Sequence, residues 1–248
     1  MTGTLYGVGT GPGDPELMTL KAVRIVRECE IIAVPISNRD ITSKPIIWNE
    51  HNDDVRHALA GCVAYQIALT NVPEMVDKPV LALPMPMSKD KAELKRIHDA
   101  GAKAVADLLQ QGRNVCFLTL GDPTVYSTYL YVHKRIQEMG YPAEIVSGVP
   151  SFCSVAAGMG IGLVENKEAL HVIPSSYGIE EALELPGTKV LMKAGKKMAQ
   201  VKKEIRETNQ KFYMMENCGM PDEKRYTDID QVPDETSYFS LIILKEDK

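Results

Sequence analysis

The stretch Gly-Val-Gly-Thr-Gly-Pro-Gly-Asp at residues 7–14 follows a short apolar run and opens a helical pattern. Glycines at such a strand-to-helix turn allow tight turning and a close approach of a ligand to the backbone. Neither glycine register completes a dinucleotide fingerprint, because Pro12 and Asp14 stand where the third glycine is required. The stretch also lacks the lysine of a Walker loop. It therefore predicts a ligand-binding turn of an α/β protein, and an ordinary glycine-rich turn is the alternative.

Short apolar runs alternate with helical stretches on both sides of this turn. The runs lie at residues 5–8, 31–34, 80–83, 115–120 and 144–146. Between them, periodic apolar residues predict helices over about 17–29, 92–111 and 125–139, the first with Asp14 as N-cap and Pro15 in its first turn. This alternation is typical of a parallel sheet covered by helices, here with five strands.

The pattern changes after Leu163. Strand-like runs recur at residues 170–173, 190–192, 212–215 and 238–244, but only some of their connections can hold a helix. The fold class predicted is therefore α/β with two domains, an N-terminal one over 1–165 with a parallel five-stranded sheet and a C-terminal one over 166–248 with a mixed sheet. The polar stretch 37–54 is the longest ambiguous insertion.

The composition narrows the partners. The chain has 248 residues, of which 44% are hydrophobic and 25% charged, so it can bury one large core or two modest ones. A formal net charge of -5 gives no attraction to nucleic acid or an anionic membrane. There is no run of about eighteen apolar residues and no export signal at the N-terminus. Widely spaced cysteines without a CxxC pair indicate reduced thiols, so we expect a soluble cytoplasmic protein.

Two further turns follow predicted strands. Gly121-Asp122-Pro123 comes directly after the run at 115–120, where open parallel sheets place their ligands. Val146-Ser147-Gly148-Val149-Pro150 again follows a strand and precedes a helix of small residues. One such turn is usually only a turn. Three strand ends with special backbone chemistry predict one shared cleft.

Three segments, GVGTGPGDPELMTLKAV (7–23), FLTLGDPTVYSTY (117–129) and VSGVPSF (146–152), resemble in order and spacing the signatures of the tetrapyrrole methyltransferase family, over essentially the whole chain. Within the family, residues 33–35, 83–87 and 238–241 look like the group that methylates carbon 20 of precorrin-2, or of cobalt-factor II, in cobalamin biosynthesis. Pro35 stands where uroporphyrinogen-III methyltransferases carry an acidic residue, which argues against that activity. The resemblance implies a homodimer that binds S-adenosylmethionine in a cleft between the two domains.

The resemblance also implies which residues contact the cofactor. Asp122 is the expected partner of its ammonium group or ribose. Met192 and Cys218 have core packing as an alternative. The full set of expected contacts is Pro12, Leu120, Gly121, Asp122, Val125, Ser151, Phe152, Met192, Asn217, Cys218, Ser240 and Leu241.

The resemblance implies methyl transfer to a carbon that is already nucleophilic, so positioning is the main task and no covalent intermediate is needed. A base that assists could be any of His57, Tyr126, Glu216 or Asp14, and the sequence does not choose among them.

The substrate's many carboxylates call for basic side chains. The candidates are Arg39, Lys44, Arg56 and Lys193, although a solvated surface charge is the alternative for each. Residues 50–57 match no familiar metal spacing, so we expect no metal bound by the protein itself. Any cobalt would arrive inside the substrate.

Three alternatives stay open. Another member of the same family, acting at a different corrin carbon or on a protein as diphthine synthase does, would bind the cofactor in the same way. A non-catalytic tetrapyrrole-binding protein would keep the fold without turnover. A nicotinamide-dependent oxidoreductase is disfavoured by the broken glycine fingerprint and by Pro35 at the end of the second strand.

Overall fold

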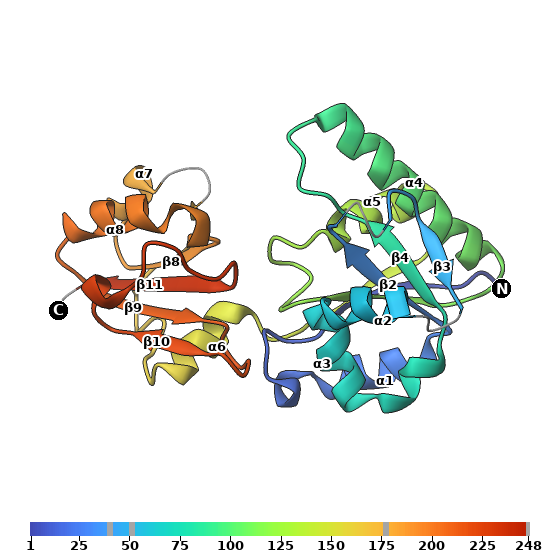
Figure 1. Cartoon of the computed structure of the whole chain (residues 1–248), viewed down its shortest axis with the longest axis horizontal. Coiled ribbons are helices and arrows are strands. Elements are labelled where there is room, and N and C mark those ends of the chain that lie inside the picture. Colours follow the sequence, from blue (N-terminus) through green and yellow to red (C-terminus); the bar gives the residue numbers. More distant parts are fainter. Residues whose placement is uncertain (39–41, 50–52, 176–178, 247–248) are drawn as a thin grey trace. The chain divides into compact units, whose positions relative to one another are not determined.

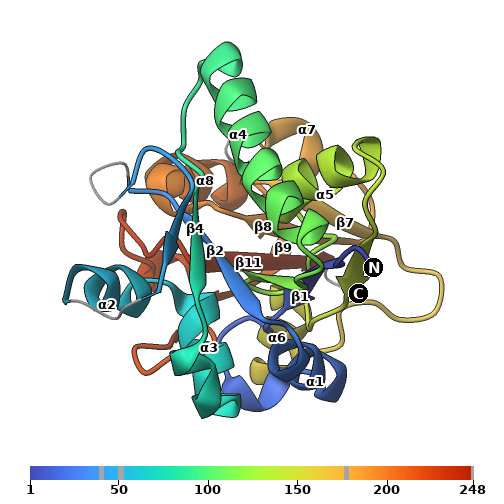
Figure 2. The same ribbon diagram turned by 90° about the vertical axis from the view of Figure 1, so that its right-hand side faces the viewer.

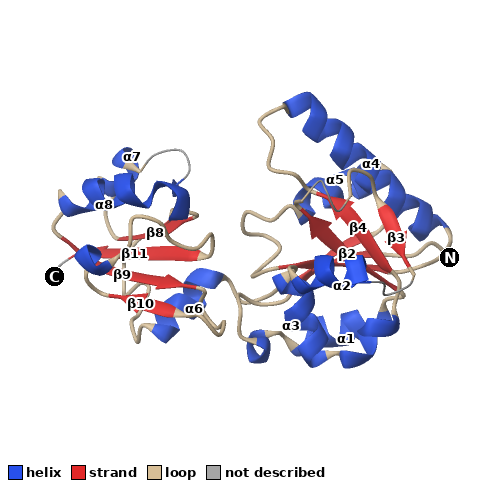
Figure 3. Ribbon diagram, viewed as in Figure 1, coloured by secondary structure: helices blue, strands red, loops and turns tan. Residues whose placement is uncertain are grey.

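The computed structural model describes residues 1–38, 42–49, 53–175 and 179–246. By its contacts the chain divides into two compact units, Met1–Pro150 and Ser151–Lys248 (Figure 1). Each unit contains one β-sheet with helices on both faces (Figure 3). The mixed α/β class and the two sheets confirm the fold class expected from the sequence.

The sheet of the first unit has the strand order β3-β4-β2-β5-β1-β6. The strands are β1 (Leu5–Gly9), β2 (Ile31–Ile36), β3 (Ile46–Trp48), β4 (Val80–Pro84), β5 (Val115–Thr119) and β6 (Ala143–Val146). The five predicted strands are present and parallel. The sheet is nevertheless not purely parallel, because β3 pairs antiparallel with β4 at one edge.

Consecutive residues of a strand point to opposite sides of the sheet. Since consecutive residues of the central strands are apolar, both faces of this sheet are apolar. Val8, Ile32 and Cys116 pack on the side of α1 (Leu20–Glu28) and α3 (Val63–Asn71). Leu5, Ile31 and Phe117 pack on the other side, that of α4 (Lys91–Gln110) and α5 (Tyr129–Glu138). Figure 2 shows the two helical layers with the strands between them. The remaining elements are η1 (Pro15–Leu17), α2 (Asp53–Ala60) and η2 (Pro73–Asp77).

The first predicted helix is two elements. Asp14 caps η1, where its carboxylate accepts the N–H of Glu16 at 2.9 Å. The α-helix begins later, with Thr19 as N-cap accepting the N–H of Ala22 at 3.2 Å. The helix predicted at 125–139 likewise begins only at Tyr129, so the turn at 120–128 is free of helix.

The sheet of the second unit has the order β10-β9-β11-β8-β7 and is mixed, as predicted. Its strands are β7 (Leu170–Pro174), β8 (Thr188–Met192), β9 (Gln210–Glu216), β10 (Lys224–Tyr226) and β11 (Ser240–Glu246). Only β7 and β8 are parallel among these pairs of described strands. The short strand β10 has no counterpart among the predicted runs.

Helices again cover both faces. α6 (Ser151–Gly158) packs through Val155 and Ala156 against β8, β9 and β11. The opposite face is covered by α7 (Glu180–Leu183) and α8 (Met198–Arg206). Two 3₁₀ turns, η4 (Gly195–Lys197) and η5 (Ile229–Gln231), complete the unit. The sequence pattern places the second domain from 166, whereas α6 groups by contacts with the second unit from Ser151.

None of the helices in the described parts of the chain combines the length and apolar character needed to cross a membrane.

Candidate functional site at two strand edges

Three loops of the first unit converge at the carboxyl ends of β5, β1 and β6, which are neighbours in the sheet. Their backbones touch at Gly9, Gly121 and Gly148. A Cβ on Gly148 would lie 2.2 Å from the carbonyl oxygen of Gly121, and one on Gly9 would lie 2.6 Å from the same oxygen. Any side chain at these two positions would therefore push the loops apart.

Hydrogen bonds lock the first two loops together. Gly121 N donates to Gly11 O at 2.8 Å, and Gly11 N donates to Gly121 O at 3.3 Å. Both glycines are left-handed, with φ of 80° and 73°, a conformation that a side chain would strain. At Gly121 a Cβ would meet Val149 O at 3.9 Å, so there is room for another atom on that side of the Cα although N and O are engaged with Gly11. Pro12 is buried beside this bridge.

The carboxylate of Asp122 faces donors of the protein itself. Its Oδ2 accepts the N–H of Gly148 at 3.0 Å, and its Oδ1 accepts the N–H of Thr124 at 2.8 Å together with the Thr124 hydroxyl. The residue is only 7% exposed. The side chain thus ties the loop after β5 to the loop after β6. Leu120 and Val125, on either side, are half-buried.

The expected residues of the second unit lie at one edge of its sheet. Leu241 pairs with both Met192 on β8 and Met215 on β9, and Ser240 pairs with Glu216. Asn217 and Cys218 continue from the end of β9 at the same edge. The register of three strands therefore brings Met192, Asn217, Cys218, Ser240 and Leu241 to one edge of the sheet, although no single sequence motif contains them.

The side chains of Asn217 and Ser240 are already engaged. Asn217 Oδ1 accepts the Ser237 hydroxyl at 2.6 Å, and Asn217 Nδ2 donates to Asp222 Oδ2 at 2.7 Å. The Ser240 hydroxyl donates to Ser237 O at 2.6 Å. These bonds hold both side chains in place at the end of β9 and the start of β11.

Helix α6 joins this edge through its first turn. Phe152 packs against the cluster that contains Met215, Cys218 and Leu241. The Ser154 hydroxyl lies 3.3 Å from Cys218 Sγ. Ser151 and Phe152, expected at the site from the sequence, are half-buried and belong to the same unit as Cys218.

The four candidate bases occupy different environments. His57 is exposed on α2, and Asp14 caps η1. Tyr126 is exposed in the turn after β5, with a left-handed φ of 48°. Glu216 is buried, and it accepts the Tyr226 hydroxyl at 2.8 Å. Burial and this bond to Glu216 raise the pKa of Tyr226 to about 12.

The basic candidates within the described residues are divided between the two units. Lys44 and Arg56 are exposed in the first unit, where Arg56 contacts Asp53 at 3.4 Å, and Lys193 is exposed in the second. Arg39 and residues 50–52 lie outside the described residues. Within the described parts of the chain, no three His, Cys, Asp or Glu side chains gather as metal ligands would.

Backbone conformation marks both edges. Four described non-glycine residues have a positive φ. Among them, Lys193 and Asn217 directly follow β8 and β9, and Tyr126 lies in the turn between β5 and α5. Such conformations cost of order 1–3 kcal/mol each and cluster at binding sites. The sequence prediction contained Gly9, Thr124 and Gly148 only within the three turns expected to form one cleft, not as individual site residues, and it did not include Ser237.

A family model described as Tetrapyrrole (Corrin/Porphyrin) Methylases matches residues 4–233. The chain belongs to this family. Among curated proteins, the tetrapyrrole methylase chain is 34% identical to a probable cobalt-precorrin-2 C(20)-methyltransferase of Methanocaldococcus jannaschii, over 76% of this chain and 71% of the relative. It is 27% identical to a precorrin-2 C(20)-methyltransferase of Sinorhizobium sp, over 98% of this chain and 95% of the relative.

A solved structure gives the same fold. Uroporphyrin-III C-methyl transferase from Thermus thermophilus, complexed with S-adenyl homocysteine, superposes on this tetrapyrrole methylase with a TM-score of 0.63. The match covers 98% of each chain at 22% sequence identity.

Proposed function

We propose that this tetrapyrrole methylase transfers a methyl group from S-adenosylmethionine to carbon 20 of precorrin-2 or of its cobalt-containing counterpart. The similarity to relatives named for this reaction, one of them along 98% of the chain, is the observation that carries the proposal. Pro35 in place of an acidic residue at the end of β2 disfavours uroporphyrinogen-III as the substrate. Relatives are named for both precorrin-2 and cobalt-precorrin-2, so the proposal covers both forms.

The residues present fit a cofactor with a charged, polar end. Gly121 leaves room on one side of its left-handed Cα, beside the buried Pro12. At the other edge, the half-buried Met192 lies beside the buried Cys218 and Leu241 and would give an adenosyl group an apolar neighbour. S-adenosylmethionine supplies an activated methyl group when it is bound. We propose that one cofactor molecule contacts residues of both units, through the twelve positions expected from the sequence.

The chemistry asks the protein chiefly for alignment. Bound S-adenosylmethionine would supply its methyl group to carbon 20 and leave as S-adenosylhomocysteine, and the proton displaced from carbon 20 would pass to water or to a base. Holding donor and acceptor in line contributes on the order of 7–11 kcal/mol in the best oriented cases. Fixed loops at both strand edges suit this task, because three glycine contacts and the Asp122 tie leave the first edge little freedom. We also propose a homodimer in the cytoplasm.

Incubation with S-adenosylmethionine and either precorrin-2 or cobalt-factor II tests the activity. We expect the product to gain one methyl group at carbon 20, seen by mass analysis and located by nuclear magnetic resonance of carbon-labelled methyl. Methylation at another carbon would assign the chain to a different corrin-ring methyltransferase. Tetrapyrrole binding without turnover would make it a carrier.

Cofactor binding has a separate readout. S-adenosylhomocysteine at about a hundred times its dissociation constant should stabilise the native state by about 2.7 kcal/mol, since it does not bind the unfolded chain. A thermal midpoint unchanged by saturating ligand would contradict the cofactor assignment. Light scattering on the same sample reports whether the protein is a dimer.

A further inference from the structure

Glu216, the last residue of β9, buries a carboxylate among neutral partners. It is 4% exposed. Its Oε1 accepts the hydroxyl of Tyr226 at 2.8 Å, and its Oε2 accepts the backbone N–H of Ser237 at 2.8 Å. Burying a carboxylate is unfavourable unless hydrogen bonds replace its water, so both bonds must be kept for this position to be tolerated.

The bond to Ser237 fixes a whole turn. The Ser237 hydroxyl donates to Asn217 Oδ1 at 2.6 Å and accepts the N–H of Phe239 at 3.1 Å. Asn217 N donates to Phe239 O at 3.1 Å, which closes the turn onto the end of β9. Gly195, the first residue of η4, packs against it, since a Cβ there would lie 2.6 Å from Ser237 O. The turn 236–240 is therefore bonded to the end of β9 and packed against η4.

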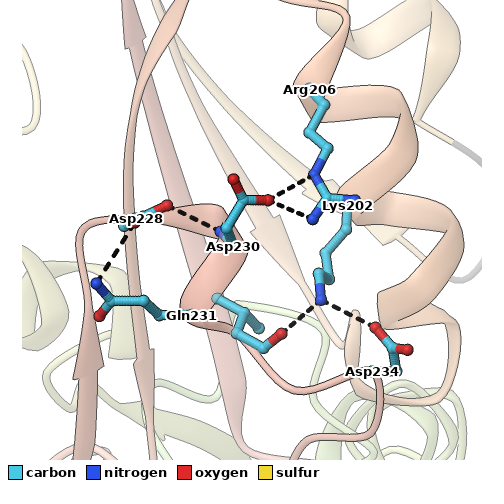
Figure 4. A network of polar contacts seen from close by, with 7 residues as sticks. Lys202, Arg206, Asp228, Asp230, Gln231 and Asp234 are labelled. Atoms are coloured by element: carbon cyan, nitrogen blue, oxygen red, sulfur yellow. Dashed lines mark hydrogen bonds and ion pairs between the residues drawn. The ribbon is translucent and has the colours of Figure 1, made fainter.

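The other end of the same β10–β11 connection is held on α8. Lys202, only 7% exposed, donates to Val232 O at 2.5 Å and to Asp234 at 2.9 Å (Figure 4). Arg206 binds Asp230 one turn further along the same helix. This second anchor keeps residues 228–234 in place whatever happens at Glu216. Loss of the Glu216 bonds should therefore loosen the turn 236–240 alone.

We propose that Glu216 is a positioning residue of the cofactor site, whose carboxylate holds the turn 236–240 against Asn217 at the edge where Met192, Cys218 and Leu241 meet. We assign it no proton transfer from the substrate, because its carboxylate is buried and each of its oxygens is held by a hydrogen bond inside the protein. The turn also carries Tyr238 and Phe239, exposed rings in edge contact at 5.3 Å. The inference rests on the proposed function and assigns a role within that same site.

Two substitutions separate positioning from proton transfer. In Glu216→Gln, the amide oxygen can still accept from Ser237, and the amide NH₂ can donate to the Tyr226 hydroxyl, because a hydroxyl both donates and accepts. Glu216→Ala removes both contacts. A positioning role predicts that alanine weakens S-adenosylhomocysteine binding and raises KM for S-adenosylmethionine about ten- to hundred-fold, while glutamine restores both to within a few-fold.

If Glu216 were the proton acceptor of the reaction, the opposite results would be expected. Glutamine would then be as inactive as alanine, with kcat reduced about 10²- to 10⁴-fold and S-adenosylhomocysteine affinity unchanged. That outcome would overturn the proposal. Glu246→Ala is the matched control, since Glu246 accepts the N–H of Gly187 at 2.8 Å from the opposite end of β11. It should lower the thermal midpoint without altering affinity or KM, and an equal effect of the two alanine variants on affinity would also overturn the proposal.

Two measurements keep the test decisive if Glu216→Ala folds poorly. Tyr226→Phe removes only the donor to Oε1 and should weaken S-adenosylhomocysteine binding in the same direction by a smaller factor. Hydrogen exchange of the Ser237 and Phe239 amides, measured without cofactor, should accelerate in Glu216→Ala while amides of 228–234 stay unchanged. Unchanged exchange of these two amides would show that Glu216 does not hold the turn 236–240 in place. If the wild-type chain binds no S-adenosylhomocysteine, that result would instead contradict the proposed function itself.

Discussion

The carboxylate of Asp122 accepts from two backbone N–H groups, Gly148 and Thr124, and neither donor can become an acceptor. An asparagine there can turn its oxygen to only one of them, so its NH₂ group must face the other N–H. We therefore expect Asp122→Asn to lower the free energy of unfolding by about 1–3 kcal/mol, since a buried donor loses its partner. Urea unfolding followed by circular dichroism measures the change.

Asp14 is the matched control, because it also lies in a turn that follows a strand of the first sheet and also accepts a backbone N–H. It only caps η1, and asparagine caps about as well as aspartate, so Asp14→Asn should change stability by a few tenths of a kcal/mol. Titration with S-adenosylhomocysteine completes the comparison. Weaker binding in Asp122→Asn alone supports a role at the site, whereas a near-neutral Asp122→Asn would contradict the tie between the two loops.

Residue identity could be predicted from the sequence better than residue role. Asp122 was visible in the Gly-Asp-Pro turn, but its expected partner was a ligand, and its observed partners are Gly148 and Thr124. Which oxygen of Asp122 meets which donor depends on the registers of β5 and β6 on the two sides of β1, which no local sequence pattern encodes. For the same reason the sequence could name Glu216 as titratable but not show that both its oxygens are occupied.

At the scale of elements, a lysine outside helix α1 caps the C-terminal end of that helix. Lys78 Nζ donates to the carbonyl oxygens of Val26, Arg27 and Cys29 at 2.8, 2.7 and 2.6 Å. These carbonyls end the helix and have no partner within it, and a positive charge there also opposes the negative end of the helix dipole. Lys78→Met should lower the free energy of unfolding by about 1–3 kcal/mol, measured by urea unfolding.

Lys21→Met on the same helix is the control for that change. Lys21 is exposed near the N-terminus of α1, where its loss should shift stability by no more than about 0.5 kcal/mol. Equal effects of the two substitutions would mean that the three carbonyls are satisfied by water once Lys78 is gone.

Elements with a long apolar signal were predictable, and short ones were not. Strands β1, β2, β4 and β5 are buried on both faces, so each appears as an apolar run, whereas the edge strand β6 carries an exposed Glu144. Strands β3 and β10 have three residues each and lie at sheet edges, where half of the side chains meet solvent. The split of η1 from α1 at Thr19 was also hidden, because the apolar period continues across the cap.

At the scale of the whole molecule, each unit has its own cores on the two faces of its own sheet. The expected cofactor residues fall in both, with five from Pro12 to Val125 in the first unit and seven from Ser151 to Leu241 in the second. A ligand that binds residues of both must couple their unfolding, because it is released when either one opens.

The single tryptophan allows this coupling to be measured. Trp48 lies on β3 and packs against a core of the first unit, so its fluorescence reports that unit alone, whereas far-ultraviolet circular dichroism reports both. We expect saturating S-adenosylhomocysteine to raise the midpoints of both signals together. If only the fluorescence midpoint rises, the cofactor binds the first unit alone. If the fluorescence midpoint stays unchanged while the dichroism midpoint rises, the cofactor binds the second unit alone. If the two signals already coincide without ligand, Asp122→Asn and Glu216→Ala decide, because each lies in a different unit and both must then reduce the ligand-induced shift.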